Sequence, residues 1–492
     1  MQNKVITGSK GTYIYRVLSI TIALISLISG LLMLIRVDWS SIYRWLFILP
    51  IGHAIIIMIN NRSIDLNDLP WTRLFVLFGY SIRNVITPLF FVLGNCNYTG
   101  VHTIRVASER DLNSAIALML YETLVLFVGM SYLYSKVSKK EYRSEDMLDD
   151  QEIVNRTIPK GLTLYSLAMM IIIAIVSIAY IKVPGIRKAY NSIWTTDSLT
   201  LVLASEGEIH SYASGTIDRI LYAFFSMFFS ILQILLSVQL VYWIKTKMKS
   251  ATAGLFLSFI VVVLAVTLFV SDSTIFSVYL SIILFIFLRD IYRENIRMVY
   301  IIGGSGALVI IIALIAAKVS FWSADTSNGF TMLSSLFNAY FPGVFNISRS
   351  FNIDAPGKLS TFCTDLYKSI PLQSLIPNLS SSQKLADYYN QSAYTNYQII
   401  PFVTHAYYYF GLFGPMVQLL FLRYSIKAEM RMNRTNNYLN YIACTTTIVL
   451  FGLGIVTYNI TSILRVFWKD ILPCIILARW SNIRAIVRKS IG

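Results

Sequence analysis

Residues 251–288 read ATAGLFLSFIVVVLAVTLFVSDSTIFSVYLSIILFIFL, and Asp272 is the only charged residue among them. The stretch consists of two apolar runs of about 20 residues, a length that crosses a bilayer as a helix. Only Ser271 and Asp272 separate the two runs. The stretch therefore predicts a tight hairpin of two membrane-spanning helices.

The whole chain shares this apolar character. Hydrophobic residues make up 56% and charged residues 13% of its 492 positions, and the mean hydropathy is +0.62. Soluble domains carry about 25% charged residues, and a soluble fold could not hide so much apolar surface from water. A soluble globule, a disordered chain, collagen and a coiled coil are thereby excluded. We expect an all-α polytopic integral membrane protein that forms a single membrane domain over residues 1–492.

Apolar runs of spanning length recur along the chain and predict about twelve transmembrane helices. The first run is too long for a cleavable signal peptide, and no small-residue cleavage site follows it. The predicted spans cover approximately residues 15–36, 42–59, 74–93, 113–134, 162–182, 219–243, 251–270, 273–289, 298–317, 400–422, 438–458 and 462–479.

Basic residues predict the orientation of these spans. The larger part of the 41 Lys and Arg residues falls in the segments on the side of the N-terminus. Cytoplasmic loops are the ones enriched in Lys and Arg, so both termini are expected inside the cell. The formal net charge of +16 is then a topology signal, and no nucleic-acid partner is expected.

Two outer loops stand out for their length. The first covers residues 183–218, and the second covers residues 318–399, between the ninth and tenth spans. Within the second loop, apolar residues recur at steps of three and four over residues 332–345. This pattern predicts an amphipathic helix in the outer membrane interface, bent at Pro342 and Gly343.

Charged residues inside spans are costly and are therefore candidate functional residues. Arg83 lies at the centre of the third span and Glu122 near the centre of the fourth. Because consecutive spans run antiparallel, the two side chains can meet near the middle of the membrane. They are either a structural ion pair or a pair that lines a cavity, which a kink at Pro88 could open.

A second group of candidates consists of basic residues near the outer ends of spans. Such residues can hold a phosphate or pyrophosphate through charge-assisted hydrogen bonds, or they can extend to lipid headgroups. The residues in question are Arg219, Arg349, His405, Arg465 and Lys469.

His405 also has two interpretations. It can act as a general base near a reacting hydroxyl, or it can be an interfacial ring like the tyrosines that follow it. The nearest outer carboxylates that could orient it are expected to be Asp272 and Asp470. Tyr394 and Tyr409 are likewise either interfacial tyrosines or rings that stack on sugars.

Several chemistries lack a motif in this chain. There is no Gly-rich phosphate loop and no G-x-S-x-G element. The four cysteines form no CxxC pair, so a metal site is not expected. Cys96 and Cys363 both fall in predicted outer segments, which permits a disulfide, but free thiols are the simpler interpretation.

Two regions of the chain, one early and one late, carry distinctive motifs. The early region reads LFGYSIRNVITP over residues 77–88, followed by LMLYE over residues 118–122. The late region reads YFPG over 340–343, AYTNY over 393–397 and YFGLFG over 409–414. These regions resemble the Wzy-type O-antigen and capsule polymerases, which join oligosaccharide repeat units in bacteria. Family members often show N-x-Y-T-x-F-x-P followed by F-G-x-x-G. Ala393 and Tyr397 depart from that pattern.

The resemblance implies a glycosyltransferase in the bacterial inner membrane. It would transfer a chain carried on undecaprenyl pyrophosphate to a hydroxyl of the next lipid-linked unit, without nucleotide, metal or other cofactor. Its implied partners are the undecaprenyl-pyrophosphate-linked oligosaccharide and membrane lipids, with a chain-length regulator and a flippase. The alternatives are a lipid-linked oligosaccharide flippase or other transporter, and an O-antigen ligase.

Roles for individual residues follow from this resemblance taken together with the chemistry above. His405 is the expected base, and Arg349 and Arg465 are expected to contact the leaving pyrophosphate. Arg83 and Glu122 are expected to form the intramembrane pair. The expected substrate-binding residues are Arg219, Lys469, Tyr394 and Tyr409.

Overall fold

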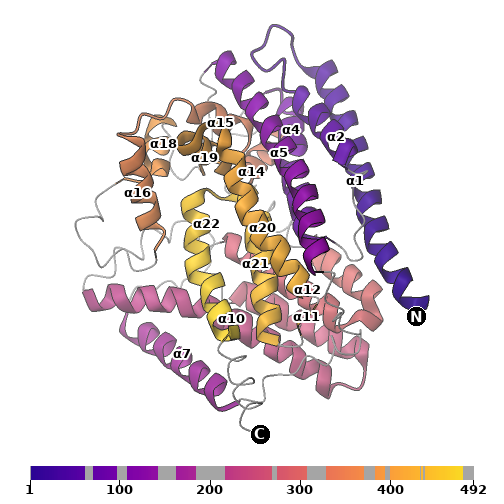
Figure 1. Ribbon diagram of the computed structural model, residues 1–492, viewed down its shortest axis with the longest axis vertical. Helices are drawn as coiled ribbons and strands as arrows, with labels where there is room; N and C mark the ends of the chain where they lie inside the picture. The colour runs from indigo at the N-terminus through magenta and orange to yellow at the C-terminus, as the bar shows by residue number, and fades with distance from the viewer. Residues whose placement is uncertain are drawn as a thin grey trace.

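The computed structural model shows a helical protein (Figure 1). No strand occurs in the part of the chain that it describes, so the predicted all-α class is confirmed there. The described residues are 2–60, 70–96, 108–141, 162–183, 216–268, 274–306, 308, 329–370, 383–393, 399–432, 434–435 and 438–479.

The N-terminal part forms four long helical segments that run side by side (Figure 1). α1 packs on α2, and α2 packs on α5. The third segment is continuous but contains a π-helical turn, η2, just before Pro88. Its position fits the kink expected there, because proline removes a backbone donor from the helix. The bounds are α1 Gln2–Arg36, α2 Ile48–Asn60, α3 Trp71–Ser81, η2 Ile82–Ile86, α4 Thr87–Leu93 and α5 Glu109–Glu141.

The C-terminal part supplies the centre of the bundle. α20 packs on both α5 and α21, and α21 packs on α3. Helices at the two ends of the sequence therefore share one core. The bounds are α20 Gly414–Met432, α21 Tyr438–Thr457, α22 Ile460–Val466 and the π-helical η6 Phe467–Ile471, which residues 472–479 continue as a helix.

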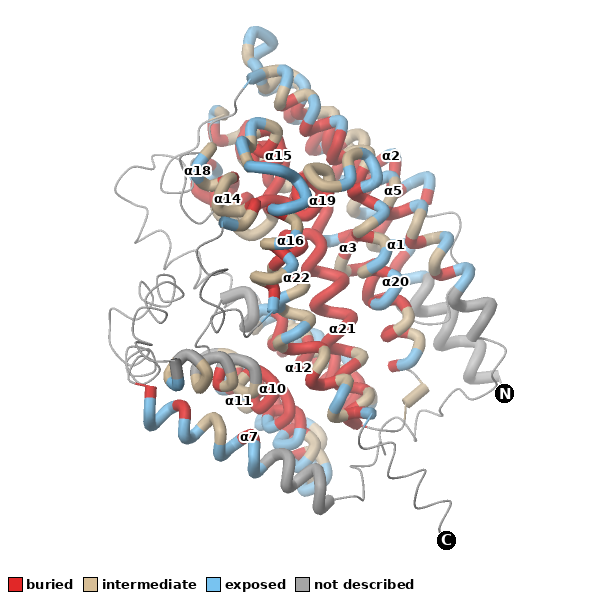
Figure 2. Tube along the Cα trace, turned by 60° about the vertical axis from the view of Figure 1, so that its left-hand side comes forward, coloured by how far each residue is buried: buried red, intermediate tan, exposed pale blue. Residues whose placement is uncertain are grey.

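The middle of the chain forms a separate layer at the end of the molecule where α20 ends (Figures 1 and 2). α11 packs against α12, as the predicted hairpin requires, although the turn between them lies outside the described residues. α12 joins the layer to α21. The bounds are α7 Leu162–Lys182, α10 Thr216–Lys247, α11 Ala251–Leu268, α12 Thr274–Ile291 and η3 Arg293–Asn295, followed by helical residues 296–306.

The long outer loop folds into short helices at the opposite end of the bundle (Figure 1). The predicted helix with a bend at Pro342 is confirmed, because α14 ends at Tyr340 and α15 begins at Val344. The first outer loop, by contrast, lies almost entirely outside the described residues. The bounds are α14 Gly329–Tyr340, α15 Val344–Ser350, α16 Lys358–Lys368, α18 Leu385–Ala393, α19 Phe402–Phe410 and η5 Gly411–Phe413.

The predicted tenth span over residues 400–422 is wrong as a single helix. The structure breaks it into α19 and α20 at a corner made by two glycines. Gly411 has a φ of +58°, which strains other residues, and a Cβ at Gly414 would lie 2.9 Å from the Tyr407 nitrogen. The backbones approach too closely at this corner for a side chain. α20 therefore begins later than expected and extends to Met432.

The buried residues of α14 are mostly small and polar. α14 buries Thr331, Ser334 and Asn338 together with Met332, while Phe330 is exposed. The Ser334 hydroxyl donates to the Thr87 carbonyl of α4, next to the kink. Small polar residues that allow close helix contact are typical of packing inside membranes.

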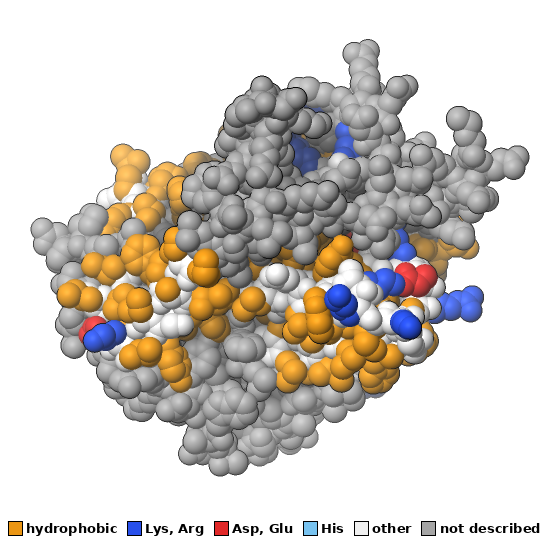
Figure 3. Space-filling model, turned by 90° about the horizontal axis from the view of Figure 1, so that it is seen from below, with side chains coloured by type: hydrophobic (Ala, Val, Ile, Leu, Met, Phe, Trp, Pro, Cys, Tyr) orange, Lys and Arg blue, Asp and Glu red, His pale blue; other side chains and the backbone are white. Residues whose placement is uncertain are grey.

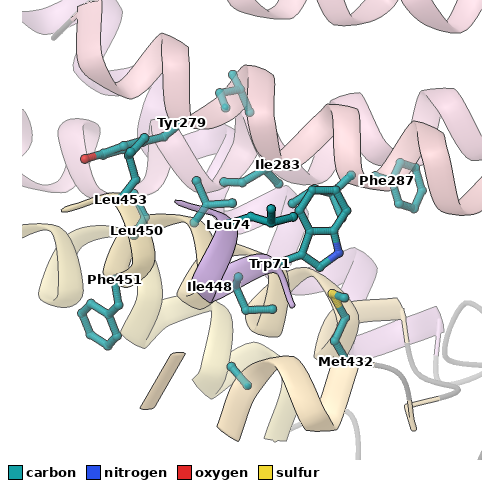
Figure 4. Close-up of a cluster of buried hydrophobic side chains, with 14 of the residues drawn as sticks. Trp71, Leu74, Tyr279, Ile283, Phe287, Met432, Ile448, Leu450, Phe451 and Leu453 are labelled. Atoms are coloured by element: carbon teal, nitrogen blue, oxygen red, sulfur yellow. The ribbon is translucent and has the colours of Figure 1, made fainter. Parts of the chain in front are cut away.

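Apolar side chains from distant parts of the sequence meet in the main core (Figure 4). Trp71 and Leu74 of α3 lie among Ile283 and Phe287 of α12 and Ile448 of α21, and all five are buried or nearly so. Figure 2 shows the same pattern, with α21 buried along almost its whole length. This burial makes α21 the central helix of the molecule.

Five of the described helices are long and apolar enough to cross a membrane, and three shorter ones are apolar. This is compatible with a membrane protein; the number of about twelve spans and their orientation stay predictions. Figure 3 shows the end at which α20 ends, where Lys and Arg side chains are more prominent than Asp and Glu on the described surface.

Candidate functional site

A buried cluster of three side chains joins α16 to α19 at the outer-loop end. The His405 Nε2 lies 2.7 Å from the Asp365 Oδ2. The Tyr409 hydroxyl donates to the same oxygen at 2.6 Å. The other carboxylate oxygen accepts from the Leu385 N–H at the start of α18, at 3.2 Å. One carboxylate therefore connects three helices.

Local sequence explains why these groups meet. α19 starts after Pro401, because proline has no backbone N–H to donate to a preceding helical turn. The His405 N–H donates to the Pro401 carbonyl in the first turn. Tyr409 follows His405 by four residues and so lies on the same helix face. Thr361 and Asp365 on α16 and Ser369 directly after it follow at the same spacing and are all buried.

The charge state of Asp365 follows from its partners. Burial by itself raises the pKa of Asp365, but the hydrogen bond and charge of His405, with the bonds from Tyr409 and Leu385, outweigh this effect and leave the pKa below its usual value. Asp365 is thus an ionised acceptor. It follows that the Nε2 of His405 carries a proton.

The other ring nitrogen of His405 is in the opposite situation. The His405 side chain is 1% exposed, and its Nδ1 has no hydrogen-bond partner among the described residues. A buried polar atom without a partner costs about 1–3 kcal/mol. The geometry leaves this nitrogen ready to accept a hydrogen bond from a group that the chain itself does not supply.

Aromatic rings surround the cluster on the side of α16. The Phe362 ring meets the Tyr409 ring edge to face at 5.0 Å between centroids, and it also contacts Phe410. The Tyr408 ring lies 5.2 Å from the Tyr409 ring between centroids. The Lys358 ammonium lies over the Tyr408 ring, 5.6 Å from its centroid. Half-exposed rings next to charged and polar groups suit contact with sugar rings.

The three expected pyrophosphate-binding and catalytic residues have different surroundings. Arg349 is half-buried, and its Nη2 donates to the Ser392 carbonyl, so it ties α15 to α18. Arg465 is exposed on α22, a helix that contacts both α16 and α19. Arg465 is therefore on a helix that packs against the two helices of the His405 cluster. Arg349, by contrast, forms a hydrogen bond to a backbone carbonyl.

The expected substrate-binding residues are only partly brought together. Tyr409 belongs to the His405 cluster. Lys469 is half-exposed in η6, after α22. Arg219 lies in the first turn of α10, and its side chain is not described. Tyr394 lies outside the described residues.

The intramembrane pair is formed. The Arg83 Nη1 lies 3.0 Å from the Glu122 Oε2, and both side chains are at most 1% exposed. The Glu122 Oε1 also accepts from the Tyr80 hydroxyl and the Gln418 amide, each at 2.6 Å. Gly343, in the bend after α14, packs against Arg83. The pair thus joins three spans and lies next to the folded outer loop.

Sequence reasoning missed Asp365. It named Asp272, which lies outside the described residues, and Asp470, which is buried in η6. The available signal was the four-residue spacing of Thr361, Asp365 and Ser369 in a loop expected to be mostly irregular. That spacing marks one face of a helix, but it does not say what the face packs on.

Two further predictions about chemistry concern thiols and metals. Cys96, Cys363, Cys444 and Cys474 are free cysteines, so no bond joins Cys96 to Cys363. Within the described ranges, no group of three or more His, Cys, Asp or Glu side chains is arranged to hold a metal ion.

Comparison of the chain with protein-family models, with characterised proteins and with solved structures gives no match.

Proposed function

We propose that this protein is a polymerase that joins undecaprenyl-pyrophosphate-linked oligosaccharide repeat units at the outer face of a bacterial plasma membrane. The observation that carries the proposal is the buried Asp365–His405–Tyr409 cluster, whose histidine keeps one ring nitrogen without a partner. The resemblance of residues 74–125 and 340–415 to Wzy-type polymerases gives the substrate class. O-antigen or capsular polysaccharide is the proposed product.

The proposed reaction needs a base for a sugar hydroxyl and cations for a leaving pyrophosphate. The hydroxyl oxygen bonds to C1 of the reducing-end sugar, the bond from C1 to the pyrophosphate oxygen breaks, and its electron pair leaves with undecaprenyl pyrophosphate. His405 takes the hydroxyl proton. Arg465, exposed next to α16 and α19, is the proposed contact for the developing negative charge.

Arg349 takes a different part in the proposal. Its guanidinium donates to the Ser392 carbonyl near the end of α18. Asp365 contacts the start of the same helix through the Leu385 N–H. The remaining donors of an arginine can still face an anion. Arg349 is therefore proposed to place the loop and to contact pyrophosphate with those remaining donors.

A flippase and a ligase remain the alternatives. A flippase would be expected to present cations to a substrate inside the bundle, but Arg83 is neutralised by Glu122. A ligase shares the pyrophosphate chemistry and differs in its acceptor. Neither alternative has an observation of its own that favours it over the polymerase.

Deletion of the gene, followed by electrophoresis of the cell-surface polysaccharide, separates the three functions. A polymerase defect leaves a single repeat unit on the acceptor and removes the ladder of longer products. A flippase defect leaves no unit on the acceptor and traps lipid-linked units inside. A ligase defect leaves polymer on the lipid carrier. Either of the last two results would overturn the proposal.

A further inference from the structure

Among the residues that the structure describes, Asp365 is the one acidic side chain in hydrogen-bond contact with the expected base, and no sequence motif pointed to it. Its Oδ2 forms hydrogen bonds with the Nε2 of His405 and with the Tyr409 hydroxyl, while its Oδ1 accepts a hydrogen bond from the Leu385 N–H. The Asp365 side chain is 3% exposed. A carboxylate held at both oxygens cannot turn, so it fixes the plane and the tilt of the imidazole.

We infer that Asp365 is the positioning residue of His405, and that Nδ1, not Nε2, is the nitrogen that accepts the proton of the substrate hydroxyl. The inference rests on the proposed function for its substrate, a sugar hydroxyl of a lipid-linked oligosaccharide. Asp365 itself touches no reacting atom. It acts by holding one tautomer of the ring.

The tautomer follows from the hydrogen-bond inventory. An ionised carboxylate only accepts, so the proton of a neutral His405 ring is on Nε2 and the lone pair is on Nδ1. A protonated ring would place an N–H at Nδ1, where no acceptor lies among the described residues.

Turnover follows the order of a general base. The acceptor hydroxyl donates to Nδ1, and its proton moves there as the oxygen bonds to C1 and pyrophosphate leaves. The imidazolium that forms is stabilised by Asp365 through the Nε2 hydrogen bond. Because His405 is covered, the hydroxyl reaches Nδ1 only if a neighbouring side chain shifts.

Other charged groups near the cluster also affect its titration. The pKa of Lys368 is lowered by burial and by Lys384, while Asp387 and Asp365 oppose that shift. The groups to be considered, from each packed helix, are Arg349 of α15, Lys368 of α16, Lys384 and Asp387 at α18, Tyr408 and Tyr409 of α19, and Arg465 of α22.

The first test reads the tautomer without any activity assay. The full chain is labelled with ¹⁵N-histidine, reconstituted in lipid vesicles and studied by solid-state NMR, and His405→Gln identifies the signal. The expected result is a neutral ring protonated at Nε2 in the native protein, and a mixture of tautomers in Asp365→Asn. A ring protonated at Nδ1, or an unchanged signal in Asp365→Asn, would overturn the inference.

The second test is the pH dependence of polymerisation by the same vesicles. Asp365→Asn is expected to lower kcat by about 10²- to 10⁴-fold with little change in KM, and to move the acid limb of the profile to lower pH. Tyr409→Phe, which removes one donor to the same oxygen, is expected to move the limb to higher pH. The same profile in all three proteins would contradict a positioning role.

Controls separate this inference from the proposed function. Asp354→Asn changes an exposed carboxylate near Tyr408 and is expected to leave the tautomer unchanged. If His405→Gln polymerises normally, the proposed site is wrong whatever the tautomer. If His405→Gln is inactive while Asp365→Asn keeps the native tautomer and profile, the function stands and the role of Asp365 is refuted. Thermal unfolding of each variant shows whether it is folded.

Discussion

Asp365 receives hydrogen bonds from α18 and α19 while it lies on α16. A single carboxylate therefore contributes both to the fold of the outer loop and to the orientation of His405. Glu122 does the same inside the bundle, where it joins Tyr80, Arg83 and Gln418. Each is a buried carboxylate whose partners come from more than one helix, so removing the carboxylate takes a hydrogen bond from all of them.

The acid stability of the protein depends on Asp365. Its pKa is lowered in the folded state, so the unfolded chain binds a proton there first as the pH falls. Its contribution is fully present above the unfolded pKa of about 3.9 and is lost as the pH falls through the folded pKa. Between pH 6 and pH 3, we expect the native protein to lose more thermal stability in detergent than Asp365→Asn loses.

Circular dichroism melting curves at a series of pH values measure this difference. Asp354→Asn, at an exposed carboxylate, serves as the control and should keep the native pH dependence. Parallel curves for the native protein and Asp365→Asn would show that the hydrogen bonds of Asp365 contribute nothing to folding.

Breaking the Arg83–Glu122 pair on one side should be costly. Arg83→Met leaves Glu122 as a buried charge, and we expect a loss of about 3–5 kcal/mol in the free energy of unfolding. Arg83→Met combined with Glu122→Gln removes both charges and should recover most of that loss. Denaturant unfolding in mixed micelles gives the values. A double variant as unstable as the single one would mean that the pair itself stabilises the bundle.

Two features of individual elements decide where the site lies. One is the sharp corner between α19 and α20, and the other is the side of α16 that buries polar residues. The corner at Gly411 and Gly414 ends α19 at Phe410, one residue after Tyr409, and turns the chain into α20. The second feature is α16, which buries Thr361 and Asp365 and exposes Leu359 and Leu366.

The corner predicts different costs for alanine at its two glycines. Gly414→Ala should destabilise strongly, because a Cβ there would lie 2.9 Å from the Tyr407 nitrogen. Gly411→Ala should cost about 1–3 kcal/mol, because a φ of +58° with a ψ of −137° strains a residue that has a side chain, while nothing lies within 4 Å of its Cβ position. Gly304→Ala, also without neighbours within 4 Å and in a helical segment, is the control. Melting temperatures in the opposite order would refute this account of the corner.

The exposed leucines of α16 predict contact with lipid. Leu359 is 76% and Leu366 39% exposed, while the buried residues of α16 are the polar Thr361 and Asp365. Exposed leucines opposite a buried polar side fit an apolar surrounding. Spin labels at Leu359→Cys and Leu366→Cys, with Cys363→Ser, should be more accessible to oxygen than to a water-soluble nickel chelate. A label at Asp354→Cys should show the reverse. Equal accessibility at all three positions would place α16 in water.

At the scale of the whole molecule, composition and apolar run length predict an all-helical membrane protein well, because the bilayer dictates both. Most helix positions, the bend at Pro342 and the Arg83–Glu122 contact are also visible in the sequence. The break at Gly411 is not, because it depends on a close backbone approach between α19 and α20. Asp365 was missed because its partners Leu385, His405 and Tyr409 are 20 to 44 residues away.

The most direct test of the account uses purified protein in vesicles with a lipid-linked oligosaccharide repeat unit, without nucleotide sugar and with a metal chelator. The native protein should produce a ladder of polymers and release one undecaprenyl pyrophosphate for each bond formed, while His405→Gln should leave single units. Absence of a ladder from folded native protein, or an undiminished ladder from His405→Gln, would contradict the proposed function and its site.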